Sequence, residues 1–282
     1  MYTLLISVAC SVAVSVLLKI ARRNDIHIAQ AIAVNYVIAA ALCLFILQPH
    51  PSSLLAPSTP WWILIALGLL LPTIFLAMAG AVRHAGIVLS DAAQRLSLFI
   101  PLIAAFVLFD EALAPGKLAG IGLALIALVC LLVRPRAQAT SGDLKSTVAL
   151  LLAVWVGYGT IDVLFKQLAK SGAAFSSSLF AAFVLAGIVI FLYLLIQRTQ
   201  WRRRSLIAGV ILGVLNFSNI YFYIRAHQVF PGNPTLVFST MNIGVISLGA
   251  IVGAGFFKEK LSWLNGLGVL LAIGAIVALI PR

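Results

Sequence analysis

The sequence is poor in charge. Only 9% of its 282 residues are Asp, Glu, Lys or Arg, against about 25% in an ordinary soluble domain. Hydrophobic residues make up 63% of the chain, and its mean hydropathy is +1.14. A single soluble core of this length cannot bury so much apolar surface. The composition therefore excludes a soluble domain and predicts an integral membrane protein.

The sequence also lacks the motifs of metal, cofactor and nucleotide chemistry. Its three cysteines lie inside apolar runs without the spacing of metal ligands, and no two of its four histidines have that spacing. We find no P-loop, nucleophile elbow or zinc motif. We therefore predict no catalytic residue, no metal site and no cofactor, and we expect that the protein is not an enzyme. Any uphill transport must then be driven by an ion gradient.

A cleavable signal peptide is not evident, because the first apolar run begins at Thr3 without a basic segment before it. The net charge of +12 does not indicate a nucleic-acid partner either. Its basic residues punctuate the apolar runs instead of forming one stripe, which is typical of signals for membrane topology.

Ten apolar runs are long enough to cross a bilayer as helices, which needs about 20 residues each. They cover residues 3–20, 28–47, 61–82, 86–109, 112–133, 147–168, 173–196, 205–224, 234–257 and 261–280. A polar linker, 134–146, divides them into two sets of five. The expected units are residues 1–135 and 144–282.

The end of the first unit is repeated at the end of the second. Residues 109–134 align with 257–282 without a gap at a shift of 148, and ten of the 26 pairs are identical. The Phe, Glu, Gly and Arg pairs carry more weight than the Leu and Ala pairs, which match partly by chance. Because five is an odd number, the second unit must enter the membrane upside down. The predicted fold is all-α, with ten transmembrane helices in two inverted five-helix repeats and a binding site near mid-membrane.

The distribution of Lys and Arg predicts the orientation. The connections after the odd-numbered runs hold 13 of them, and the opposite ends hold five. The positive-inside rule then places both termini on the non-cytoplasmic side of a bacterial inner membrane. Lys166 and Lys170 oppose this assignment.

Polar residues inside the runs are candidates for a site, because a charge in the hydrocarbon costs roughly 2.5–3.5 kcal/mol unless a cavity or partner receives it. Asp91 and Arg95 lie one helical turn apart, with Gln94 beside them. They can form the floor of a site for a charged or zwitterionic substrate, or a structural ion pair that neutralises itself. The 148-residue shift places Asp91 on Ser239 and Gln94 on Asn242, so two repeat-related helices carry polar residues at matching positions.

Run 147–168 carries Tyr158, Asp162 and Lys166 at successive steps of four. Asp162 can accept a proton or bind a cation, and the alternative is a salt bridge with Lys166. Asp91 is the other candidate for proton coupling.

Run 205–224 carries Asn216, Asn219 and Tyr223. Two amides in one membrane span need partners, which can be neighbouring helices, water or substrate. We expect the amides to select the substrate by hydrogen bonding, and Tyr223 to form an aromatic wall together with Tyr158.

The segments EALAPGKLAG (111–120) and EKLSWLNGLG (259–268) share the pattern Glu-x-Leu-x6-Gly before a final apolar helix. Together with Lys19 and Lys166, which close the first helix of each half, they resemble the EamA type of the drug/metabolite transporter superfamily. AQRLSLFIP (93–101) resembles a pattern of one bacterial branch of that family, and the second half lacks it at 241–249.

Characterised members of that superfamily move amino acids, drugs, nucleotide sugars or sugar phosphates through a central cavity by alternating access. The resemblance therefore implies a secondary transporter, and we expect an exporter of a small polar or amino-acid-like metabolite. Its expected partners are that substrate and membrane lipids, without nucleic acid, in a monomer or homodimer. The alternatives are a lipid or polyprenyl-phosphate carrier and a non-transporting assembly or sensor protein.

Overall fold

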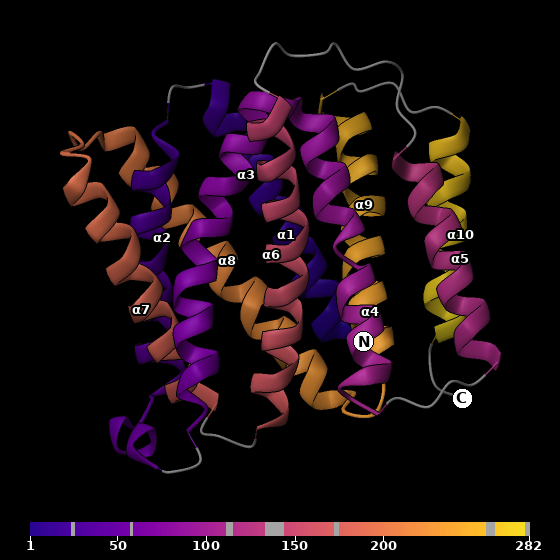
Figure 1. Cartoon of the computed structure of the whole chain (residues 1–282), viewed down its shortest axis with the longest axis horizontal. Coiled ribbons are helices and arrows are strands. Elements are labelled where there is room, and N and C mark those ends of the chain that lie inside the picture. The colour runs from indigo at the N-terminus through magenta and orange to yellow at the C-terminus, as the bar shows by residue number, and fades with distance from the viewer. Residues whose placement is uncertain are drawn as a thin grey trace.

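The structure is a computed structural model that describes residues 1–23, 26–56, 59–110, 115–132, 144–171, 175–257 and 263–279. Those residues form a bundle of helices, and no strand occurs among them (Figure 1). The helices are α1 (Tyr2–Arg23), α2 (Ile28–Leu42), α3 (Trp61–Leu96), α4 (Phe99–Val107), α5 (Pro115–Leu132), α6 (Leu144–Lys170), α7 (Phe175–Ile196), α8 (Arg203–Val229), α9 (Pro234–Phe257) and α10 (Trp263–Leu279). A π-helical turn, Cys43–Leu47, extends α2, and a short 3₁₀ helix, Pro51–Leu55, precedes α3.

Six helical stretches in the described part of the chain are long and apolar enough to cross a membrane. They are Ile28–Leu47, Trp61–Ala81, Lys145–Lys170, Phe175–Ile196, Arg203–Val229 and Pro234–Phe256. The four other predicted spans contain shorter apolar helices, Tyr2–Leu17, Ala93–Val107, Leu118–Cys130 and Gly266–Ala275. The prediction of a helical membrane protein is confirmed, and the ten-span inverted repeat stays a prediction.

The boundary between α3 and α4 differs from the sequence prediction. We expected a helix end near Val82 and a new start at Gly86, but helical hydrogen bonding continues to Leu96. The interruption comes at Ser97–Leu98 because Pro101 has no N–H for the carbonyl of Ser97 and its ring displaces that carbonyl. The Ser97 oxygen accepts a tighter bond from Ile100 N, at 3.0 Å.

The chain nevertheless reverses its direction within α3, and its contacts with α6 show this. In chain order the facing pairs are Ile74 with Gly157, Gly80 with Leu150, Leu96 with Trp155, and Ile100 with Gly159. The first two pairs run down the numbering of α6 and the last two run up it. The end of α3, together with α4, is therefore antiparallel to the beginning of α3, as two separate spans would be.

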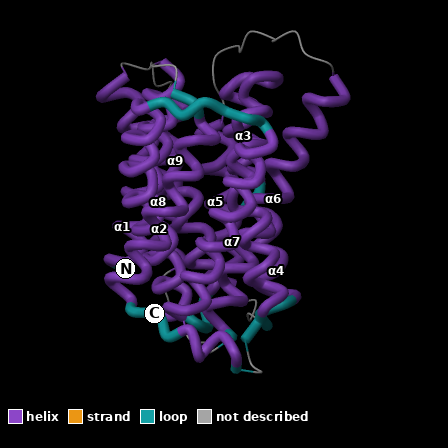
Figure 2. Tube along the Cα trace, turned by 90° about the vertical axis from the view of Figure 1, so that its left-hand side faces the viewer, coloured by secondary structure: helices purple, strands orange, loops and turns teal. Residues whose placement is uncertain are grey.

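The tightest helix pairs occur in matched sets. Helix α3 packs along α6 as α8 packs along α1, and α2 lies against α8 as α7 lies against α3. Helix α4 contacts α6 as α9 contacts α1, while α5 and α10 pair with each other beside α9 (Figures 1 and 2). Within each set, one pair turns into the other when five is added to or subtracted from each helix number.

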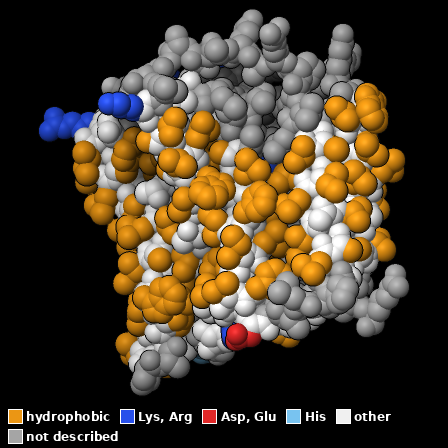
Figure 3. Space-filling view, turned by 45° about the vertical axis from the view of Figure 1, so that its right-hand side comes forward, with side chains coloured by type: hydrophobic (Ala, Val, Ile, Leu, Met, Phe, Trp, Pro, Cys, Tyr) orange, Lys and Arg blue, Asp and Glu red, His pale blue; other side chains and the backbone are white. Residues whose placement is uncertain are grey.

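The main apolar core lies between α2, α3, α6, α7 and α8, with Tyr36 and Phe183 among its largest buried side chains. Glycine lets α8 approach α2 closely: a Cβ on Gly209 would lie 2.5 Å from the Val34 Cβ and 2.8 Å from the Ala31 carbonyl oxygen. On the outer face shown in Figure 3, hydrophobic side chains cover the middle of the bundle, and the coloured charged ones lie near its ends. This is the surface expected of a protein that faces lipid.

Candidate functional site

A buried polar cluster forms where α6, α8 and α9 meet. The hydroxyl of Tyr223 on α8 donates a hydrogen bond of 2.8 Å to Asp162 Oδ1 on α6. Tyr223 is 4% exposed, and its ring meets the edge of Phe165 with the centroids 6.2 Å apart. The bond places a carboxyl group and its hydroxyl partner inside the bundle, where solvation by bulk water is weak.

Helix α9 adds two of the predicted site residues to this cluster. The side chain of Asn242 lies beside the carboxyl group of Asp162, and its Nδ2 donates to the Phe238 carbonyl at 3.1 Å. Ser239 is fully buried, and its hydroxyl has no hydrogen-bond partner among the described residues. The structure thus brings together Asp162, Tyr223 and Asn242 from three different helices, and Ser239 lies one turn before Asn242 on α9.

The two amides of α8 are engaged by other helices. Asn216 Nδ2 donates to Asn35 Oδ1 on α2 at 3.1 Å in the buried interior. Asn219 Oδ1 accepts a bond of 2.8 Å from the hydroxyl of Ser7 on α1, which also approaches Met241 Sδ at 3.4 Å. In this structure both amides hold α8 against the first two helices, as polar residues between membrane helices often do.

The predicted residues at the end of α3, Gln94 and Arg95, lie at a different depth in the bundle from the Asp162 cluster. Arg95 is 8% exposed, and Gln94 is half-buried, with its carbonyl accepting from Ser97 Oγ at 2.6 Å. The next carbonyl along from Arg95, that of Leu96, accepts from Trp155 Nε1. Trp155 precedes Asp162 by seven residues of α6, about 10 Å along the helix axis. The side chain of Asp91 lies outside the described residues.

Tyr158 lies one helical turn before Asp162 on α6. It is half-buried and packs against the main apolar core. Its position fits the predicted aromatic wall between the depth of Arg95 and that of Asp162, which stays a prediction.

Sequence reasoning named Lys166 but missed the group to which it belongs, at the ends of α4, α6 and α8. Lys166 is 3% exposed, donates from Nζ to the Pro231 carbonyl at 2.9 Å, and lies over the Phe109 ring at 5.8 Å. His227 is 1% exposed and is held between the rings of Tyr223 and Phe238, with centroids 4.9 Å away in both cases. The signal in the sequence was that His227 follows Tyr223 by four residues, on the same face of one helix.

This group lines a hollow of about 300 Å³. Its walls are Phe109, Lys166, Ala169, Lys170, His227, Gln228 and Pro231. Neither ring nitrogen of His227 has a hydrogen-bond partner among the described residues. A basic and partly polar hollow therefore lies at this end of the bundle. Tyr223 stands between His227 on its wall and the carboxyl group of Asp162.

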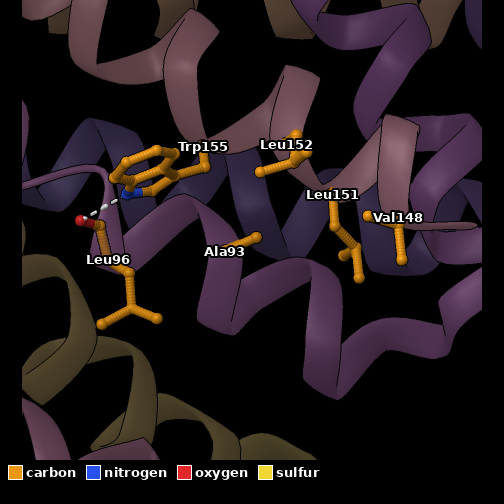
Figure 4. A pocket seen from close by; sticks show the side chains of 6 residues that line it. All are labelled: Ala93, Leu96, Val148, Leu151, Leu152 and Trp155. Carbon is orange, nitrogen blue, oxygen red and sulfur yellow. Dashed lines mark hydrogen bonds between the residues drawn. The ribbon is translucent and has the colours of Figure 1, made fainter.

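A second depression, of about 240 Å³, lies on the outer surface between the end of α3 and the beginning of α6 (Figure 4). Its walls are apolar: Ala93, Leu96, Val148, Leu151, Leu152 and Trp155. Val148 and Leu152 are about half exposed, at 46% and 52%. The polar atom Trp155 Nε1 is already bonded to the Leu96 carbonyl, at 3.0 Å. The walls are otherwise apolar, so the groove can take a hydrocarbon chain.

Residues 1–133 match the EamA-like transporter family. This part of the chain belongs to that family. The resemblance to the drug/metabolite transporter superfamily is thereby confirmed over this range, and the matched family is one of transporters and not of enzymes. The long apolar helices are those of a multi-pass membrane protein.

Two whole-chain comparisons agree in length with this protein. An uncharacterized protein of Haemophilus influenzae is 53% identical over 284 residues, which cover 99% of this chain and 97% of that protein. A crystal structure superimposes with a TM-score of 0.72 at 18% identity, covering 99% of this chain and 96% of the other. At that identity the second comparison shows a shared fold alone.

Proposed function

We propose that this EamA-like protein is a secondary active transporter that exports a small polar or amino-acid-like metabolite across a bacterial inner membrane by alternating access. The observation that carries the proposal is the hydrogen bond from Tyr223 to Asp162 inside the bundle. Ionisable residues within membrane spans are costly and mark substrate or ion pathways by default. A scaffold has no need for an ionisable residue in a span, beyond packing.

The matched helix pairs support an inverted repeat of two five-helix units, 1–135 and 144–282, as the basis of transport. The matched family range, 1–133, covers nearly the whole of the first unit. In such a repeat the site lies between the units, and the Asp162 cluster is flanked by α1, α4, α6, α8 and α9 from both of them. The positive-inside rule places both termini outside the cytoplasm. The ends of α4, α6 and α8 that line the basic hollow then also lie on the non-cytoplasmic side.

The charges suggest how an amino-acid-like substrate is held. In this proposal Asp162 binds an ammonium group or a coupling proton, and Arg95 meets a carboxylate near the depth of Trp155, which precedes Asp162 by about 10 Å along α6. Gln94, Tyr158, Ser239 and Asn242 line the space between them, and Asp91 remains the second candidate for the coupling proton.

The test is a thermal-unfolding screen of the purified protein against amino acids, quaternary amines, nucleotides, sugar phosphates and lipids. A ligand that binds only the folded protein stabilises it by about 2.7 kcal/mol at a hundredfold excess over Kd. We expect amino acids or amines to raise the Tm of the wild type and of Thr160→Val but not that of Asp162→Asn. Thr160 is the matched control because its hydroxyl bonds only to Val156 of its own helix. Equal shifts in the wild type and Asp162→Asn would remove Asp162 from the site.

The second candidate function is a lipid or polyprenyl-phosphate carrier, and the apolar groove of Figure 4 favours it. That groove opens sideways, where acyl chains lie in the bilayer. The same screen separates the two functions: if long-chain anionic lipids alone raise the Tm, the metabolite exporter is rejected. Replacement of the exposed Leu152 by Asn should then abolish the shift.

A further inference from the structure

We propose that His227 is the residue through which protons from the basic hollow reach Asp162. The proposal rests on the proton role given to Asp162 above and adds the path by which that carboxyl group is reached. Three contacts form the path: His227 lines the hollow, its ring lies against Tyr223, and the Tyr223 hydroxyl is bonded to Asp162.

The hydrogen bonding of His227 is the first argument. A buried imidazole whose two nitrogens find no partner in the described part of the protein is costly. The hollow beside it is polar and large enough for several water molecules. Both nitrogens are buried in this structure, so the path needs the hollow to widen and admit water, which then meets the need of the ring and supplies the protons. A neutral imidazole has one nitrogen that accepts a proton and one that donates it, so it can receive on one side and release on the other.

The charges around His227 are the second argument. Among the described residues, α6 presents Lys166 and Lys170 on the walls of the hollow, and α8 presents Tyr223. Helix α9 contributes the apolar ring of Phe238, and α4 contributes Phe109. Two ammonium groups beside the ring disfavour a lasting positive charge on His227. His227 is therefore better suited to pass a proton on than to keep it. The final acceptor of the proton is Asp162, deeper in the bundle.

The proposed transfer moves one proton from the hollow to Asp162 by way of His227 and Tyr223. A hydronium ion in the hollow gives a proton to one ring nitrogen of His227, and the other nitrogen releases its proton through a bridging water to the Tyr223 oxygen. The Tyr223 hydroxyl proton moves along its hydrogen bond to Asp162 Oδ1. The carboxylate becomes a carboxylic acid, while His227 and Tyr223 end neutral. One proton has moved inward, and the imidazole has changed its tautomer.

The test measures how fast Asp162 is protonated in the full-length protein reconstituted into liposomes. After a sudden drop in the external pH, time-resolved infrared spectroscopy follows the C=O stretch of the carboxylic acid, and Asp162→Asn identifies the band by removing it. We expect His227→Phe to slow the appearance of the band about tenfold or more without changing its final amplitude. His50→Gln, an exposed histidine before the 3₁₀ helix, is the control and should leave the rate unchanged.

Tyr223→Phe is the second variant, since it keeps the ring and removes only the hydroxyl. It should show the same slow phase, and it decides the matter if His227→Phe does not fold. An unchanged rate in the folded variants overturns the path through His227 and leaves Asp162 as the proton site. A change in final amplitude at an unchanged rate overturns it as well. A band that survives in Asp162→Asn removes the proton role of Asp162 itself, while the metabolite screen still tests transport independently.

Discussion

The ammonium group of Lys166 holds the carbonyl of Pro231, joining the end of α6 to the turn between α8 and α9 across 2.9 Å. The two residues are 65 positions apart in the chain and meet at the mouth of the basic hollow. A charged donor makes this one of the stronger hydrogen bonds in the bundle. In an alternating-access cycle this contact has to break before the Asp162 cluster can open toward that end.

Removing the donor should therefore open this end of the bundle. We expect Lys166→Met to raise the labelling rate of a cysteine placed at Ser239 several-fold when a membrane-impermeant thiol reagent is added on the side of the hollow. Lys170→Met is the matched control, because Lys170 is exposed and lies over the same Phe109 ring at 5.9 Å. Equal labelling in both variants would show that the Lys166 bond does not keep this end closed.

The buried amide pair of Asn216 and Asn35 should contribute to stability. Asn216→Ala leaves the Asn35 amide without its described partner, and we expect a loss of about 0.5–2 kcal/mol in the free energy of unfolding. The double variant Asn35→Ala/Asn216→Ala should lose less than the sum of the single variants. Denaturation in mixed detergent micelles measures all three. Strict additivity would contradict an interaction between the two amides.

Close packing of α8 on α2 should make Gly209 intolerant of a side chain. In Gly209→Ala the new Cβ would meet Val34 at 2.5 Å and the backbone of Ala31 at 2.8 Å, so we expect a loss of about 1–3 kcal/mol. Gly249→Ala on α9 is the control, since a Cβ there meets nothing within 4 Å. A comparison of Tm values suffices. Helix propensity alone favours Ala over Gly in both variants, so a loss of the same size in both would contradict the packing explanation.

The orientation can be tested directly. Helix α1 starts and α10 ends toward the same end of the bundle (Figure 1), and the Lys and Arg distribution places that end outside the cytoplasm. A reporter enzyme that is active only outside the cytoplasm should be active when fused to either terminus and inactive when inserted into the linker 134–146. The reverse pattern would invert the direction assigned to the basic hollow.

The positions of most helices could be predicted because each is a long apolar run with polar residues at its ends. The expected run 234–257 coincides with α9, and 173–196 differs from α7 by two residues. The expected break at 82–86 differs from the helix bounds because helical hydrogen bonding continues to Leu96 and stops only before Pro101, which has no N–H. Hydropathy reports which segments enter the membrane but not where the backbone hydrogen bonds stop.

The polar cluster could be predicted only in part. Spacing along one helix identified Asp162, Tyr223 and Asn242 as candidates, but it cannot show which helices face each other. The partner of Asn216 lies 181 residues away, at Asn35, and nothing in the local pattern of either segment indicates it. His227 was missed for a similar reason, because its significance comes from the hollow beside it and not from its neighbours in the chain.

The contact between α2 and α8, close enough that only glycine fits at Gly209 and Gly213, has a consequence for how the protein moves. The contact fixes α2 of the first half to α8 of the second half. The matching contact fixes α7 of the second half to α3 of the first half. In the alternating-access cycle proposed above, we expect each moving body to combine helices of both halves, one built around α1, α2 and α8 and the other around α3, α6 and α7. A single five-helix half would leave its best-fitting faces bare. We therefore expect an isolated half to fold stably only when it pairs with a second copy inserted in the opposite orientation.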